Sequence, residues 1–363
     1  MSANGQFGSI RKLPSGRFQV RYFHLGRRIT GDTTFPTKGD ARAFLAGVET
    51  DIRRGNFFDP SAGRVTFAEY SGWWLDQRSI RPRTRQTYES QLTHLLPTFG
   101  RAQLAEITPV DVRRWHGQLF KSSLHPNSVS KIYRLFRTIL TTAVDDGLLS
   151  KNPARIRGAS KEHMIERPLL NWDQVVALAN AILPRYDALI WTAAASGLRF
   201  GELAGLTLRH FDIERSELRV EQALSYTRGL GATIGPPKTD SAHRTVVVPN
   251  QITARLCLHI EDHLNDPGPG DLLFTSMRGS PLLNRTFAPW WRRAVAEVGL
   301  HGTRFHDLRH LAGTEAATAG ASLREVMSRM GHATSSASLR YLKASEIRDR
   351  DISDAIGARM PQS

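Results

Sequence analysis

The chain has 363 residues and a mass of 40.6 kDa, which is enough for two or three domains with hydrophobic cores and excludes a small disulfide-stapled scaffold. Its 49 Lys and Arg against 34 Asp and Glu give a formal charge of +15, which favours a polyanionic partner such as nucleic acid or an anionic membrane surface. We expect a cytoplasmic protein, because the first residues lack the apolar segment of a secretory leader and no run of about 18 apolar residues occurs. The one cysteine, Cys257, excludes an intrachain disulfide and a cysteine-based zinc cluster.

Most of the excess positive charge lies in the first 160 residues. Residues 1–64 carry a net charge of +6, residues 65–160 carry +7, and residues 161–363 carry +2. This distribution is typical of DNA-gripping modules in front of a more neutral domain that performs the chemistry. For any single Arg or Lys, a solvated surface side chain is the more ordinary interpretation.

Residues 7–35 alternate as three short strands of a small antiparallel sheet, separated by turn residues at 14–16 and by Gly26. Thr37 can cap the helix predicted over residues 39–54, whose apolar positions would cover one face of the sheet. The other face is then left to basic side chains that could meet phosphates or base edges. These DNA-binding candidates are Arg17, Arg21, Arg27 and Arg28.

The pattern over residues 66–146 is helical throughout and predicts a compact module of about four helices. Pro109 and Pro126 lie near predicted helix starts, and Gly100 and Gly147 lie near helix ends. Basic residues recur on helices that also have apolar faces. Those selected as DNA-binding candidates are Arg83, Arg85, Lys131 and Arg134.

Polar segments flank this module, with a linker at residues 55–63 and a charged connector at residues 148–163. The last region mixes helices with a β stretch from about residue 218 to residue 248, and helices are predicted again from Gln251 to the end. The predicted fold class is therefore multidomain and mainly α with small β-sheets (α+β). It comprises an N-terminal three-stranded sheet with one helix, a helical module and a mixed α/β domain.

Short motifs in the last region carry charged side chains. SGLRFGEL places Arg199 at a helix start, with Glu202 three residues later on the same helical face. PPKTDSAHR places Lys238 after two prolines and before the strand TVVVP, as expected of a lysine on a β-hairpin. Taken singly, the first pair is an ordinary local ion pair and the lysine an ordinary solvated side chain.

Three further motifs follow. HDLRH places His306 and Arg309 one helical turn apart, so that both can face a single anion. MGH supplies His332, and LRYL supplies Tyr341 nine residues later. His332 alone would be an ordinary capping or packing residue. The order Arg, Lys, His-x-x-Arg, His, Tyr is much more specific than any of its members.

With these five motifs in this order, the chain from Thr66 to about Arg350 resembles the tyrosine recombinase family, the phage-type integrases and their relatives. The first 60 residues resemble the arm-site-binding domain of integrases of temperate phages and integrative elements. The resemblance implies four parts of the chain. They are an arm-type DNA-binding domain at 1–60, a core-type DNA-binding domain at 65–155, a catalytic domain at 165–350 and a C-terminal tail at 351–363.

The residue types suit a phosphoryl transfer that needs no metal and no ATP, because such catalysis consists mostly of positioning and charge neutralisation. Arg199 and Arg309 would clamp the scissile phosphate with planar charged forks, and His306 and His332 would add hydrogen bonds. Attack by Tyr341 would give a 3′-phosphotyrosyl intermediate that keeps the energy of the broken DNA bond. No cofactor is expected.

The resemblance assigns the remaining roles. Lys238 would protonate the leaving 5′ oxygen, Glu202 would orient Arg199, and Asp307 would support the site from beside His306. The implied activity is site-specific integration or excision of a phage or mobile element at core-type and arm-type attachment sites in double-stranded DNA. The implied assembly is a homotetramer on DNA, with a DNA-bending host factor, an excisionase and no membrane partner.

Several alternatives remain open from the residues themselves. His306 and His310 could form a metal pair, but no third ligand follows at a known spacing. Tyr226 could be the nucleophile, although it precedes the lysine hairpin. A third alternative is a DNA-binding regulator with an inactive catalytic domain, but such a protein should have lost at least one member of the set from Arg199 to Tyr341. A type IB topoisomerase-like enzyme would share the chemistry without needing an arm domain, and a relaxation assay without cognate sites would identify it.

Overall fold

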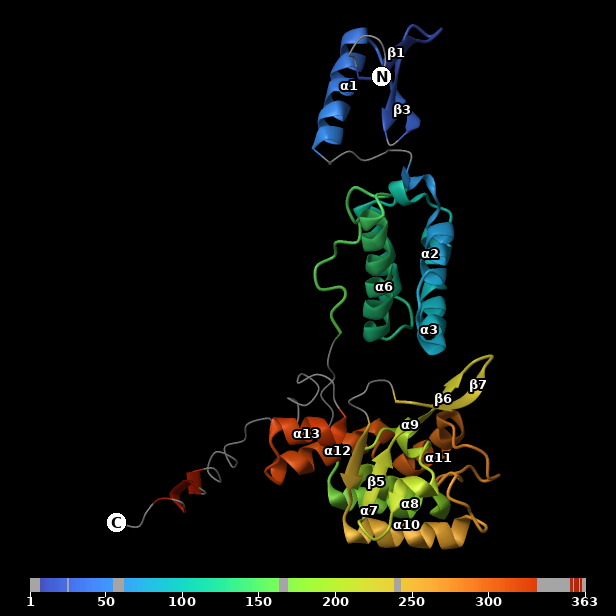
Figure 1. Cartoon of the computed structure of the whole chain (residues 1–363), viewed down its shortest axis with the longest axis vertical. Coiled ribbons are helices and arrows are strands. Elements are labelled where there is room, and N and C mark those ends of the chain that lie inside the picture. Colours follow the sequence, from blue (N-terminus) through green and yellow to red (C-terminus); the bar gives the residue numbers. More distant parts are fainter. Residues whose placement is uncertain are drawn as a thin grey trace. The chain divides into compact units, whose positions relative to one another are not determined.

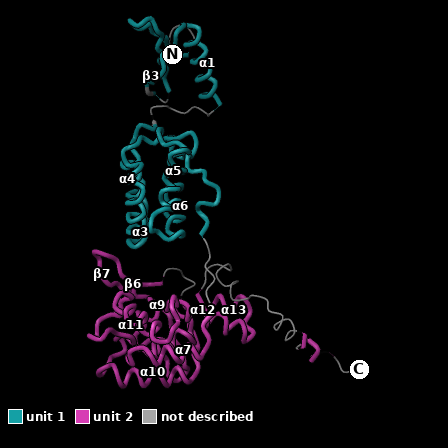
Figure 2. The backbone as a smooth tube through the Cα atoms, turned by 180° about the vertical axis from the view of Figure 1, so that it is seen from behind, with its two compact units in different colours: residues 1–165 teal, residues 166–363 magenta. Residues whose placement is uncertain are grey.

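The structure is a computed structural model. It describes residues 7–24, 26–54, 62–162, 169–237 and 243–331, with a few residues after position 352. The chain divides into two compact units, Met1–Ile165 and Glu166–Ser363, coloured separately in Figure 2. The described elements, labelled in Figure 1, are mainly helices with small antiparallel sheets, which confirms the predicted fold class.

The chain begins with a three-stranded antiparallel sheet and one helix. They are β1 (Ser9–Lys12), β2 (Phe18–His24), β3 (Arg27–Phe35), in the order β1-β2-β3, and α1 (Lys38–Arg53). As predicted, Thr37 caps α1, since its side chain accepts a hydrogen bond from Asp40 N at 3.1 Å. Val20 and Tyr22 of β2 are buried in one core with apolar residues of α1, so the helix covers one face of the sheet.

Five helices form the next part of the first unit. They are α2 (Phe67–Asp76), α3 (Pro82–Leu92), α4 (Leu96–Phe99), α5 (Pro109–Phe120) and α6 (Pro126–Asp145). The predicted starts of α5 and α6 are confirmed, because Thr108 and His125 are the N-caps and a proline follows each. The connector after α6 packs against that helix, with Tyr133 Oη accepting a hydrogen bond from Ile156 N at 2.7 Å.

The second unit is built around helix α8. Its helices are α7 (Trp172–Ala181), α8 (Asp187–Ser196), α9 (Phe200–Leu203), α10 (Asn250–His263), α11 (Asn284–Glu297), α12 (Phe305–Thr318) and α13 (Leu323–Met330). Seven of the ten residues of α8 are buried, and α7, α10 and α12 pack against it. None of the helices in the described part of the chain has the length and apolarity needed to cross a membrane.

The predicted β stretch, from about residue 218 to residue 248, forms two separate sheets, and one strand, β4 (Phe211–Asp212), lies before its predicted start. The first sheet has the order β4-β5-β8, from β4, β5 (Glu217–Val220) and β8 (Arg244–Val247), and the second is the hairpin of β6 (Ala223–Thr227) and β7 (Gly231–Gly235). The prediction of helices from Gln251 to the end is wrong over residues 264–283. That stretch has no helix and contains an isolated bridge between Thr275 and Pro281.

Gly197 ends α8 in the left-handed conformation, with φ of 69°. This conformation is strained for any residue with a Cβ atom, and a Cβ atom here would lie 2.4 Å from Met330 Cε, so the methionine side chain would have to move. The glycine of the Ser-Gly pair ahead of Arg199 is thus explained by its positive φ at the end of α8.

A buried histidine of α10 makes the stability of the second unit depend on pH. His259 is 4% exposed, and its Nε2 donates to Leu273 O at 2.8 Å. Burial lowers the pKa of His259 to about 4, whereas the unfolded chain binds a proton near pH 6.5. Because the unfolded state binds more protons between these values, the contribution of His259 to stability is present above pH 6.5 and is lost as the pH falls.

Between pH 7 and pH 5, the free energy of unfolding should fall by about 2 kcal/mol through His259 alone. His259→Gln keeps an N–H donor for the Leu273 carbonyl but cannot titrate, so its decline should be smaller by about that amount. Urea denaturation of both proteins over this pH range measures the difference. Parallel pH profiles would contradict the assignment.

Candidate active site

Arg199 begins α9 as its N-cap and is fixed there by Glu202. Its Nη1 donates to Glu202 Oε1 at 2.7 Å, and its backbone N donates to Glu202 Oε2 at 2.9 Å. The Arg199 side chain is 40% exposed, while that of Glu202 is 4% exposed. A buried carboxylate therefore holds a guanidinium that can still reach a ligand in solvent.

Arg309, on α12, is 1% exposed. Its Nη1 donates to Gly197 O and its Nη2 to Met330 O. Burial of a charged guanidinium removes it from water, and this is tolerated only where its N–H groups are hydrogen-bonded within the protein. The structure thus places Arg309 beside the backbone that leads into Arg199, but a direct contact between Arg309 and a phosphate stays a prediction.

Three arginine side chains from three different elements hold the last carbonyls of α13. The pairs are Arg244 Nε with Arg329 O at 2.8 Å, Arg309 Nη2 with Met330 O, and Arg199 Nη2 with Gly331 O at 3.2 Å. The C-terminal carbonyls of a helix carry partial negative charge, which cations stabilise. His332 is the next residue, so the arginines fix the point from which the chain enters the segment that contains His332 and Tyr341.

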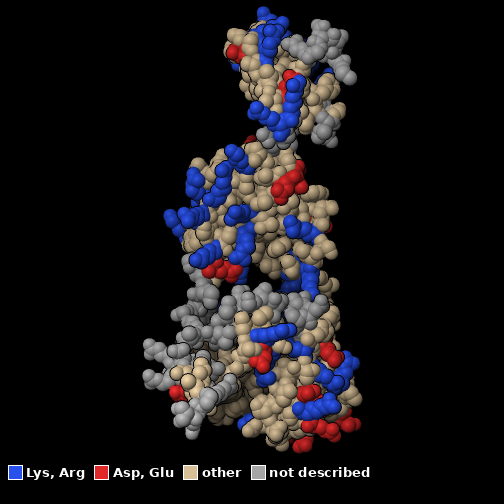
Figure 3. Space-filling view, turned by 60° about the vertical axis from the view of Figure 1, so that its left-hand side comes forward, with Lys and Arg blue, Asp and Glu red and all other residues tan. Residues whose placement is uncertain are grey.

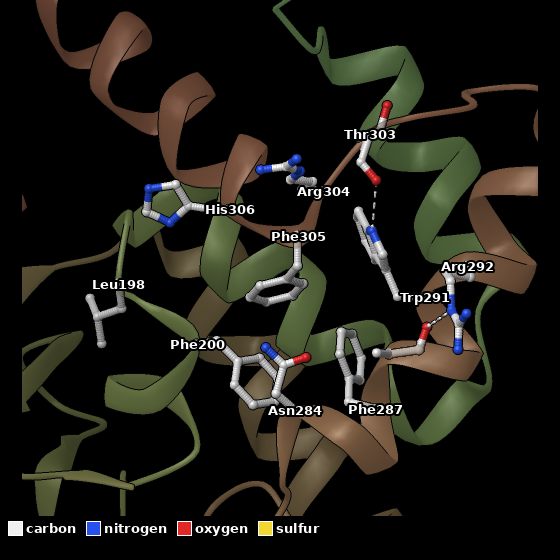
Figure 4. A pocket seen from close by; sticks show the side chains of 11 residues that line it. Leu198, Phe200, Asn284, Phe287, Trp291, Arg292, Thr303, Arg304, Phe305 and His306 are labelled. Atoms are coloured by element: carbon white, nitrogen blue, oxygen red, sulfur yellow. Dashed lines mark hydrogen bonds between the residues drawn. The ribbon is translucent and has the colours of Figure 1, made fainter. Parts of the chain in front are cut away.

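His306 lies on the first turn of α12 and lines a pocket of about 440 Å³ (Figure 4). Phe200, Phe305 and Trp291 form part of its wall. Desolvation by the surrounding protein, with the positive fields of His310 and Arg309, lowers the pKa of His306, although the side chain keeps contact with solvent. The imidazole is therefore neutral at pH 7 and has an unprotonated ring nitrogen, while the lowered pKa makes it a weaker base than a histidine in water.

Asp307 is 7% exposed and caps α12, because its Oδ2 accepts a hydrogen bond from Arg304 N at 2.7 Å. It thus fixes the helix start that carries His306. Among the described residues no group of three His, Cys, Asp or Glu side chains could hold a metal ion, and the rings of His306 and His310 are tilted 84° apart at 5.1 Å.

Lys238, His332 and Tyr341 lie outside the described residues. The β6–β7 hairpin ends at Gly235, three residues before Lys238. Tyr226, the alternative nucleophile, lies on β6 under the guanidinium of Arg285, whose Nη1 donates to Tyr226 Oη at 3.1 Å.

Two arginines near the site were missed in the sequence. Arg244 is the first residue of β8. Its side chain is 5% exposed and donates from Nη2 to Glu202 Oε2 at 2.9 Å. Arg329, on α13, donates to Val247 O at 3.1 Å and to Ala195 O at 3.0 Å. A signal for Arg244 existed, because strand alternation places it on the same face as the buried Val246.

The arginines proposed for the N-terminal sheet differ in how accessible they are. Arg17 is exposed, and its Nε donates to Thr34 Oγ1 at 2.7 Å, so it is tied to β3. Arg28 is exposed and Arg21 is half-buried, on the face of β2 opposite to its buried residues. The side chain of Arg27 lies outside the described residues.

Basic side chains gather on the visible face of the helical part of the first unit in Figure 3. Several of the candidates there pair with acidic neighbours. Arg85 pairs with Asp76 and with Glu89, while Lys131 and Arg134 both pair with Glu162, at 3.5 and 2.9 Å. Arg83 is exposed. All four stay predicted DNA contacts, since exposed ion pairs of this kind contribute little and exchange readily.

Comparison with known proteins decides the family. Residues 6–54 match the phage integrase N-terminal domain, residues 66–120 match the phage integrase N-terminal SAM-like domain, and residues 169–347 match the phage integrase family. The prophage phiRv2 integrase of Mycobacterium tuberculosis is 36% identical over 362 residues, covering 96% of this chain and 94% of the relative. The chain belongs to the phage integrase family. It is a phage-type tyrosine recombinase, and its activity is site-specific recombination.

Solved structures share the fold of this tyrosine recombinase. The Tn1549 transposon integrase in complex with transposon right end DNA aligns with a TM-score of 0.72 and 20% identity, covering 81% of this chain and 100% of that chain. A lambda integrase tetramer bound to a Holliday junction aligns with a TM-score of 0.58 and 16% identity, covering 95% and 100%.

Proposed function

We propose that this recombinase cleaves and rejoins DNA through a 3′-phosphotyrosyl intermediate on Tyr341, without metal or ATP. The observation that carries the proposal is the arrangement around α13. Arg199 and Arg309 hold the end of the helix that leads to His332, and His306 lies on the same helix as Arg309. Arg199 is therefore brought close to His306 and Arg309, which are far from it in sequence, where the chain continues towards Tyr341.

In the proposed cleavage step, Tyr341 Oη attacks the scissile phosphorus, a Tyr–phosphate bond forms and the bond to the 5′ oxygen breaks. Neutral His306 can accept the phenol proton, and Lys238 donates a proton to the leaving 5′ oxygen. Arg199 supplies the positive charge for the non-bridging oxygens, Arg309 supports the backbone next to it, and His332 is assigned a hydrogen bond to the same oxygens. Because guanidinium groups supply this charge, no metal ion is needed.

We propose that double-stranded DNA is held by separate parts of the chain, with residues 1–60 on arm-type sites, residues 65–155 on core-type sites and residues 165–350 performing the chemistry. The complexes of Tn1549 integrase with DNA and of a lambda integrase tetramer with a Holliday junction support a homotetramer that acts on two core sites. We assign residues 351–363 to a C-terminal tail. Arm binding would bring in a DNA-bending host factor and an excisionase in the cytoplasm of a bacterial host.

Covalent capture tests the proposal. Duplexes with a randomised core and a nick near the centre are incubated with the full chain in EDTA, and DNA that stays attached after denaturation is sequenced. We expect one family of core sites to be recovered, at the same yield with and without EDTA. Failure to recover any adduct, or an adduct that depends on a divalent metal or ATP, would overturn the proposal.

Deleting residues 1–54 should separate DNA binding at arm-type sites from DNA cleavage at core-type sites. This segment has its own buried core and contains none of the proposed catalytic residues. The truncated protein should still form the adduct on the selected core DNA but lose binding to a second class of site. On arm-containing DNA, the slope of log affinity against log salt should flatten by about 0.9 for each lost phosphate contact. A folded truncation that cannot cleave core DNA would show that the segment belongs to the catalytic assembly.

A further inference from the structure

We propose that Arg244 is a positioning residue of the active site, whose guanidinium joins Glu202 to the end of α13 and thereby holds Arg199 in the orientation that meets the phosphate. The inference rests on the proposed function, in which Arg199 binds the scissile phosphate. It concerns a residue outside the arginine, lysine, histidine and tyrosine set that the sequence motifs identify.

The guanidinium of Arg244 is committed to the protein interior. Its side chain is 5% exposed, and it donates from Nη2 to Glu202 Oε2 at 2.9 Å and from Nε to Arg329 O at 2.8 Å. A planar guanidinium makes both bonds from two different nitrogen atoms in a fixed geometry, whereas the N–H groups of a lysine share one nitrogen atom that rotates. Arg244 therefore ties a carboxylate on α9 to a carbonyl on α13.

Glu202 is held from both sides by this arrangement. Its Oε2 faces Arg244, and its Oε1 accepts from Arg199 Nη1 at 2.7 Å. With one guanidinium on each oxygen, the carboxylate cannot rotate without breaking a charge-assisted hydrogen bond. Arg199 is thus oriented by a group that Arg244 has already fixed.

Arg244 also keeps Glu202 charged when Arg199 turns to a ligand. Burial would raise the pKa of Glu202, but Arg244, and then Arg199, lower it below its ordinary value. Arg199 is 40% exposed, so a phosphate can compete with Glu202 for it, whereas Arg244 is shielded from such competition. The buried carboxylate therefore retains a counter-ion while Arg199 binds substrate.

Arg244→Gln tests the inference on the selected nicked core DNA. The single-turnover rate of adduct formation at saturating protein should fall by about 100-fold, which corresponds to the loss of one oriented charge in the transition state. The concentration that gives half-maximal rate should change less than about threefold, because Arg244 is too buried to bind DNA itself. An unchanged rate, or a loss confined to DNA affinity, would overturn the inference.

A substrate with a methylphosphonate at the scissile position provides a readout that a general folding defect would not change. This group is uncharged and gains little from the charge of Arg199. On it, Arg244→Gln should react within about fivefold of the wild type, since only the charge-stabilising contribution is lost. Equal slowing on both substrates would mean that Arg244 has only a structural role.

Two further variants keep the result interpretable. Arg255→Gln removes another arginine of the second unit, which pairs with Asp187 at 3.0 Å and lies over Trp191, and it should leave both rates unchanged. If Arg244→Gln does not fold, Arg244→Lys keeps the charge without the fork and should show the same selectivity at about tenfold slowing. If the wild type forms no adduct, the proposed function is contradicted. If the wild type is active but the Arg244 variants are slowed equally on the phosphodiester and the methylphosphonate, only this inference is contradicted.

Discussion

Tyr341→Phe is expected to form no covalent adduct on nicked core DNA while binding that DNA as tightly as the wild type. The substitution removes only the phenolic oxygen, so the aromatic ring is kept and the nucleophile is lost. Adduct formation should fall by at least about 10⁴-fold, as expected when a nucleophile that works with partner groups is removed. Denaturing gels with labelled DNA measure the adduct, and gel shifts measure the binding.

Tyr226→Phe is the matched control for this experiment. It removes the hydroxyl that accepts a hydrogen bond from Arg285 and should leave adduct formation within about threefold of the wild type, since that contact is exposed. An adduct that survives in Tyr341→Phe and disappears in Tyr226→Phe would reverse the assignment of the nucleophile.

Lys238→Ala should slow cleavage of a normal phosphodiester by about 10²- to 10⁴-fold, which is the range expected for loss of a general acid. In a substrate with sulfur at the 5′ bridging position, the leaving group departs as a thiolate and needs no proton. On this substrate the variant should therefore react nearly as fast as the wild type. The two rates are compared in single-turnover reactions. Equal slowing on both substrates would mean that Lys238 positions the phosphate and is not the general acid. No slowing on either substrate would mean that Lys238 is a solvated side chain without a role in cleavage.

Much of the fold could be predicted because its boundaries are set by local chemistry. Thr37 before α1 and Thr108 before Pro109 each cap a helix with a side-chain oxygen, which is a signal readable over four residues. The split of the β stretch into two sheets was not predictable in the same way. It depends on which strands pair, and β5 pairs with β8 across the whole β6–β7 hairpin.

The candidate site shows the same division between local and tertiary information. The spacing of His306 and Arg309 on one helix could be read directly, and the structure places both on α12. The burial of Arg309 could not be predicted from the sequence, because it results from tertiary packing. Arg309 packs against Gly197, which is 112 residues away, and against Met330, which lies on another helix. Arg244 was not predicted, although strand alternation places it on the same face as the buried Val246. A short strand pattern does not show which acidic side chain lies opposite that face in the folded protein.

The central claim is that the bond to DNA forms on Tyr341 through a 3′ phosphate. Digesting the wild-type adduct with nuclease and with a protease that cleaves after Glu should leave residues 326–346 as one peptide, in which Tyr341 is the only tyrosine. Tandem mass spectrometry is then predicted to find a nucleotide linked through its 3′ phosphate to Tyr341. A nucleotide on any other residue, or one linked through a 5′ phosphate, would contradict the account.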